Sequence, residues 1–60
     1  MNYIENKFDG IDFAVRYARK ALKNKDTIRL RLAVNVIKNV CEQILEKINQ
    51  NADLDKRLHL

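Results

Sequence analysis

Proline, tryptophan and serine are absent from this chain of 60 residues, and glycine, cysteine and histidine occur once each. The lone cysteine excludes an internal disulfide framework, and one histidine beside it leaves too few ligands for a closed zinc site. Without serine, and with a single glycine, the chain has neither a serine nucleophile nor a glycine-rich phosphate loop. A domain this short buries only roughly 60% of the surface that its unfolded chain exposes. Its stability therefore has to come from helix packing, from association, or from both.

The remaining reactive side chains give little support for catalysis. His59 is the penultimate residue and has no partner nearby in the sequence, which is typical of a solvated tail. Cys41 falls within an apolar stripe, where burial keeps a thiol unreactive. Glu42 and Glu46 lie one turn apart on a polar arc rather than facing a pocket. We therefore expect a non-enzymatic protein with no cofactor and no metal site.

The first segment with helical periodicity predicts a helix over about residues 10–24. Asp9 and Asp12 form a capping box at its start, and Asn24 is suited to the left-handed conformation that ends many helices. Seven apolar residues share one arc of this helix and are expected in the core: Phe8, Ile11, Ala14, Val15, Ala18, Ala21 and Leu22.

The second segment predicts a longer helix over about residues 27–50, with Asp26 or Thr27 as its cap. Residues 1–8 are expected to form an N-terminal arm or short helix, and residues 52–60 a C-terminal turn or tail. The apolar stripe of the second helix contains Leu30, Ala33, Val34, Ile37, Val40, Cys41, Ile44, Leu45 and Ile48.

A connection of two or three residues makes consecutive helices antiparallel neighbours, so residues 1–60 are predicted to form one all-α helical hairpin. The second helix is the longer one, and Ile44, Leu45 and Ile48 extend past the predicted start of the first. Either the N-terminal segment folds beside these three residues or another subunit covers them.

Surplus apolar residues outside the two stripes indicate self-association. They form two patches at helical spacing, which are the candidate interface residues: Phe13 and Tyr17, and Ile28, Leu32 and Val36. A lone hairpin has one interior, so these patches would face water. We expect a symmetric homodimer that forms a four-helix bundle. The alternative is a monomer in which residues 1–7 or 52–60 fold back over the patches.

Positive charge is concentrated around the predicted turn. The candidate anion-binding or nucleic-acid-binding residues are Arg16, Arg19, Lys20, Lys23, Lys25, Arg29 and Arg31. Those in the last turns of the first helix are favoured by the negative end of the helix dipole. Those at the start of the second helix could pair with acidic residues of a second subunit. The surplus charge also fits an anionic partner.

These features favour a small dimeric regulatory or adaptor protein that binds another protein. The alternative is a nucleic-acid-binding dimer that contacts RNA or DNA through the basic face of the first helix and the turn. The start of the second helix, Thr27–Leu32, is too apolar to read base edges. No apolar run reaches the length of a membrane span, so we expect no membrane partner. A single reduced cysteine suits a cytoplasmic location.

Overall fold

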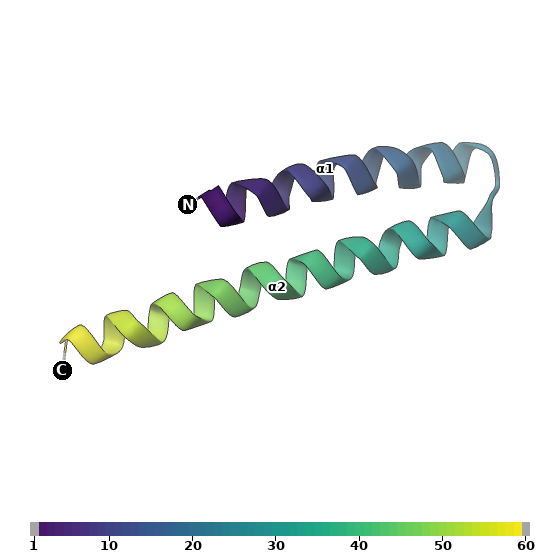
Figure 1. Cartoon of the computed structure of the whole chain (residues 1–60). Coiled ribbons are helices and arrows are strands. Elements are labelled where there is room, and N and C mark those ends of the chain that lie inside the picture. The colour runs from purple at the N-terminus through teal and green to yellow at the C-terminus, as the bar shows by residue number, and fades with distance from the viewer. Residues whose placement is uncertain (1, 60) are drawn as a thin grey trace.

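The computed structural model describes the backbone of residues 2–59 and the side chains of residues 2–50. Two α-helices, α1 (Asn2–Lys23) and α2 (Thr27–His59), lie side by side in opposite directions and are joined by a short turn (Figure 1). Within the described backbone there is no strand. The prediction of an all-α helical hairpin is therefore confirmed.

α1 begins at Asn2 rather than at about residue 10, so the predicted capping box is wrong. Residues 2–8, predicted as an arm or a separate short helix, form the first turns of α1. Contacts with α2 explain the difference. Lys7 Nζ donates a hydrogen bond to Gln43 Oε1 at 2.6 Å, and Lys47 Nζ lies 5.6 Å from the centre of the Tyr3 ring. Within α1, Lys7 Nζ also lies 5.1 Å from the centre of this ring. Helical packing across this end outweighs the roughly 1 kcal/mol that an internal glycine costs.

α2 continues to His59 instead of ending at about residue 50. The turn or tail predicted for residues 52–60 is thus helical as far as His59, while the side chains after Gln50 lie outside the described residues. The local reason is composition. The chain has no proline and no glycine beyond Gly10, so nothing in this segment interrupts the backbone hydrogen bonds.

The turn between the helices is tight because Asp26 takes part both in the end of α1 and in the start of α2. Lys25 has a φ of 56°, so Lys25 adopts the left-handed conformation that the sequence pattern assigned to Asn24. Lys25 N donates to Leu22 O at 3.1 Å and Asp26 N donates to Ala21 O at 2.8 Å, which is the Schellman arrangement. Asp26 then caps α2, because its Oδ1 accepts from Arg29 N at 3.1 Å. The predicted cap at Asp26 fits this geometry.

The two helices meet along a narrow seam whose residues are alternately three and four positions apart, the spacing of a coiled coil. Its members are Ile4, Lys7, Ile11, Ala14, Ala18 and Ala21 of α1 and Leu30, Ala33, Ile37, Val40 and Ile44 of α2. Among residues 2–50, only Ala14, Ala21, Ala33 and Ile44 are buried, and each retains 4–6% of its accessible surface. Three alanines let the helices approach closely, yet they bury little apolar area. Of the three residues that extended past the predicted start of α1, Ile44 is buried, whereas Leu45 and Ile48 stay exposed. The alternative in which the N-terminal segment covers all three is therefore met for Ile44 alone.

The hairpin is a single layer of helices. Its Cα atoms extend over 53 × 18 × 10 Å, two helices wide and one helix thick. The chain exposes 5489 Å² of surface, whereas a compact monomer of 7.1 kDa exposes about 4100 Å². Stable domains usually contain at least two packed layers. Both broad faces of this hairpin therefore lack the cover that a second layer would give.

Candidate interaction surfaces

Six residues predicted for the core lie exposed on one broad face of the hairpin. We call this surface the Phe8 face, and its members are Phe8, Leu22, Val34, Cys41, Leu45 and Ile48. Leu22 retains 64% of its accessible surface and Leu45 retains 58%. The core prediction is wrong for these residues because each apolar stripe is wider than the seam. A two-helix contact covers two positions in seven, while the stripes also fill the next position along each helix.

The opposite broad face contains an apolar groove, which we call the Phe13 groove. Side chains of both helices line it: Phe13, Ala14 and Tyr17 from α1, and Leu32, Ala33 and Val36 from α2. The buried Ala14 and Ala33 form its floor, while Phe13 is 71% exposed at its edge. The hollow measures about 190 Å³, below the roughly 300 Å³ at which small-molecule pockets begin. Its size suits one or two apolar side chains of another macromolecule.

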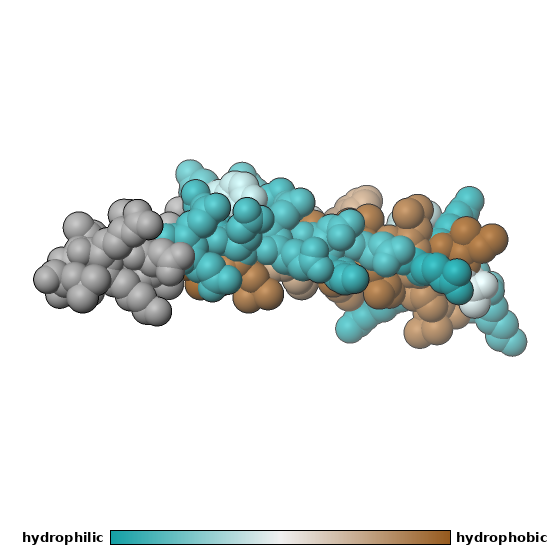
Figure 2. Space-filling view, turned by 90° about the horizontal axis from the view of Figure 1, so that it is seen from below, coloured by the Kyte–Doolittle hydropathy of each residue, from teal (hydrophilic) through white to brown (hydrophobic). Residues whose placement is uncertain are grey.

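Four of the five candidate interface residues lie together in this groove. The sequence pattern treated Phe13 with Tyr17, and Leu32 with Val36, as patches on different helices, and the antiparallel packing joins them into one surface. Ile28, the fifth candidate, is 82% exposed and does not line the groove. Seen from the α2 side, apolar side chains lie on both flanks of a polar strip near the turn (Figure 2).

A second hollow continues the Phe13 groove toward the turn. It measures about 120 Å³ and is lined by Tyr17, Lys20, Ala21, Asn24, Asp26 and Arg29. Arg29 Nε lies 3.5 Å from Asp26 Oδ2, but the exposed guanidinium makes this pair weak. Two of the predicted basic candidates, Lys20 and Arg29, thus border the apolar groove at its turn end.

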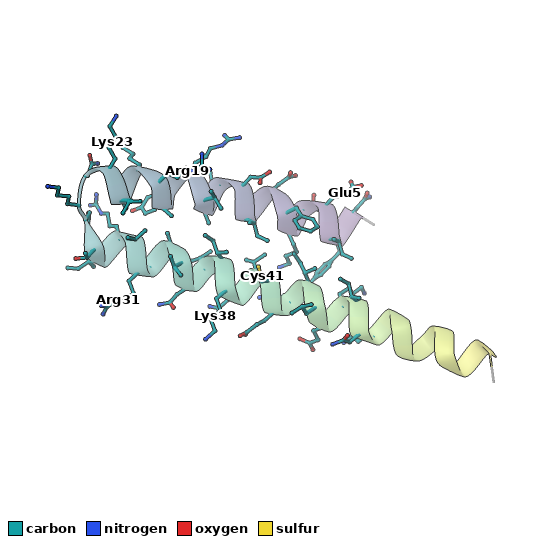
Figure 3. The ribbon with its side chains drawn as sticks, turned by 180° about the vertical axis from the view of Figure 1, so that it is seen from behind. Glu5, Arg19, Lys23, Arg31, Lys38 and Cys41 are labelled. Carbon is teal, nitrogen blue, oxygen red and sulfur yellow. The ribbon has the colours of Figure 1, made fainter. Side chains whose placement is uncertain are left out.

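The other basic candidates do not form one surface with these two. Arg19 and Lys23 project from the side of α1 that faces away from α2, whereas Arg31 projects from the side of α2 that faces away from α1 (Figure 3). Lys38, which was not among the candidates, also projects from that side of α2. Arg16 and Lys25 are also exposed. The positive charge therefore surrounds the turn end on several sides.

Charge differs sharply between the two ends of the hairpin. In residues 13–38, which form the turn half, eight basic residues accompany one acidic residue. In residues 2–12 and 39–50, which form the open half, five acidic residues accompany two basic ones. Each hairpin is thus positive at the turn and negative at the open end.

Residues 2–50 contain no group of three or more histidine, cysteine or acidic side chains placed to hold a metal ion. Cys41 is exposed rather than buried in the core, and it is labelled in Figure 3. The side chain of His59 lies outside the described residues.

Comparisons of the chain with protein-family models, with curated proteins and with solved structures found no match. In the part of the chain that the structure describes, neither helix is long and apolar enough to cross a membrane. The two broad faces and the charge distribution are the features from which a function can be inferred.

Proposed function

We propose that the chain is a small, non-enzymatic, dimeric adaptor protein that works by binding another protein. The observation that carries this proposal is the pair of apolar faces on a hairpin one helix thick. One face joins two copies into a four-helix bundle, and the other binds an apolar helix of the partner protein. Helix-in-groove recognition of this kind uses apolar anchors at helical spacing.

The surface area supports an association of this size. The whole chain exposes about 1400 Å² more than a compact monomer of its mass does. A stable interface removes about 800 Å² from each partner. Covering one face removes more than half of this surplus, and the second face remains for a partner.

A retention experiment with matched variants tests the adaptor function. The native chain is immobilised beside two single variants, Leu45→Glu on the Phe8 face and Leu32→Glu in the Phe13 groove, and a third, Ile28→Glu, that lies on neither. We expect at least one cellular protein to be retained by the native chain and by Ile28→Glu and to be lost in one of the two face variants. Retention that survives both variants, or recovery of nucleic acid alone, would contradict the proposal.

The basic turn half supports a second candidate function, the binding of RNA or DNA by the dimer. Its candidate residues project in several directions, which suits contact with phosphates rather than base reading. Such binding weakens steeply as salt is raised. An electrophoretic shift assay at about 50 mM salt tests it, and the absence of binding to both duplex DNA and hairpin RNA removes it.

A further inference from the structure

We propose that a second copy of this chain covers the Phe8 face, with its turn against the open end of the first, so that both Phe13 grooves face outward. The inference rests on the dimer in the proposed function, and it specifies the dimer interface, the orientation of the two copies and the surface that stays free. The result is a bivalent bundle with one groove on each of two opposite sides.

The position of the Phe8 face along each helix supports its use as the dimer interface. Phe8, Leu22, Val34 and Cys41 each directly follow a seam position, and Ile48 lies seven residues after Cys41 in the same spacing. In an antiparallel pair these positions share one broad face. The seam and these positions together make an apolar surface about three positions in seven wide. That is the width found on helices of four-helix bundles, whereas two positions in seven suffice for an isolated pair.

The Phe8 face also has the length that a bundle needs. Phe8 and Ile48 lie in its open half, and Leu22 and Val34 lie in its turn half. An end-to-end reversal of the second copy therefore places apolar side chains against apolar side chains along the whole face. Cys41 and Leu45 fill the stretch between Val34 and Ile48 on α2.

Charge selects the antiparallel orientation of the two copies. With the turns at opposite ends, the turn half of each copy, with eight basic residues and one acidic, meets an open half with five acidic residues and two basic. With the turns together, the two turn halves would lie over each other and their cations would repel. Glu5 and Arg19 lie on the side of α1 that faces away from α2 (Figure 3). Each is seven residues from Asp12, the residue of α1 at which the open half meets the turn half. The reversal therefore brings Glu5 of one copy beside Arg19 of the other. Such pairs set orientation more than affinity.

The Phe13 groove is poorly suited to pair with itself. Its apolar side chains all lie in the turn half, while Tyr3, Lys7, Gln43 and Lys47 interact at the open end of the hairpin. An antiparallel pairing through this face would place the apolar groove against polar groups. A parallel pairing would stack the two basic turn halves. The groove is consequently the surface left for a different protein.

Cys41 gives a test that needs no substitution. Its thiol is exposed in the single hairpin and becomes covered when a second copy packs on the Phe8 face. We expect its reaction rate with a maleimide to fall as protein concentration rises, with the same midpoint as the change in mass measured by light scattering. An equal reaction rate in monomer and dimer would show that the Phe8 face is not the dimer interface.

A distance between two spin labels tests the orientation. The label is attached to Asn24→Cys in a Cys41→Ala chain, so that each copy carries one label at its exposed turn. The antiparallel dimer places the two labels roughly 40 Å apart along the bundle, from a rise of about 1.5 Å per residue. A distance under about 20 Å would mean that the turns lie together, which contradicts the proposed orientation.

Single variants separate this inference from the proposed function. We expect Leu22→Glu and Leu45→Glu to weaken dimerisation by about 100-fold or more, because each would bury a carboxylate between the two Phe8 faces. Leu32→Glu and Ile28→Glu should dimerise like the native chain. A native chain that stays monomeric would refute the dimer itself. If the native chain dimerises and only Leu32→Glu disrupts the dimer, the dimer is supported but the Phe8 face is not its interface.

Discussion

Gly10 and Asp9 give a prediction whose sign depends on where α1 begins. In the structure both lie inside the helix, and a Cβ added at Gly10 meets nothing within 4 Å. Glycine in a helix interior costs about 1 kcal/mol relative to alanine. Gly10→Ala should therefore raise the free energy of unfolding by about 0.5–1 kcal/mol. In a chain of this length, each kcal/mol raises the melting temperature by roughly 4–8 °C.

Asp9→Ala provides the contrast, because Asp9 is exposed and caps nothing in the structure. Alanine is the better helix former, so this change should be neutral or stabilising by up to about 0.5 kcal/mol. If the helix instead began near residue 10, Asp9 would be its cap and Asp9→Ala would cost about 1 kcal/mol. Urea and thermal unfolding, followed by far-ultraviolet circular dichroism at one fixed protein concentration, measure both variants. A loss of about 1 kcal/mol in Asp9→Ala would refute the continuous helix.

Three further pairs of variants test the seam and the turn by the same unfolding measurements. Ile44 is 6% exposed and Ile28 is 82% exposed, so Ile44→Val should cost about 1 kcal/mol while Ile28→Val costs under about 0.3 kcal/mol; equal losses would contradict the assigned seam. Asp26→Ala should lower the free energy of unfolding by about 1 kcal/mol and Asp26→Asn should largely preserve it, because asparagine also caps helices; equal effects of the two would argue against the cap. Lys25→Gly should raise the free energy of unfolding by about 0.5–1 kcal/mol, since Lys25 alone among the described non-glycine residues has a positive φ. Asn24→Gly should lower the free energy of unfolding. The reverse order would place the left-handed residue at Asn24.

The hairpin itself could be predicted from sequence because two segments carry clear helical periodicity and one strong cap separates them. The start of α1 could not, since Asp9 and Gly10 form a convincing local signal for a helix start. Contacts of Tyr3 with Lys47 and of Lys7 with Gln43 override that signal. They join positions far apart in the chain, so a local pattern does not reveal them.

The surfaces were predictable only in part. Phe13 and Tyr17 were identified by their spacing, as were Leu32 and Val36, but their union in one groove depends on the register of the two helices. The Phe8 face was missed because its residues were assigned to the core. The alternating three- and four-residue spacing of the seam is the signal that could have separated them, since positions directly after seam residues border the contact instead of filling it.

The central claim is that this hairpin is one layer of a two-copy structure, and sedimentation equilibrium of the native chain tests it most directly. Measurements over about 1–100 µM should show a reversible monomer–dimer equilibrium, because association responds to concentration by mass action. The limiting mass should be twice the 7.1 kDa of the single chain. A single folded species of 7.1 kDa at every concentration would contradict the claim.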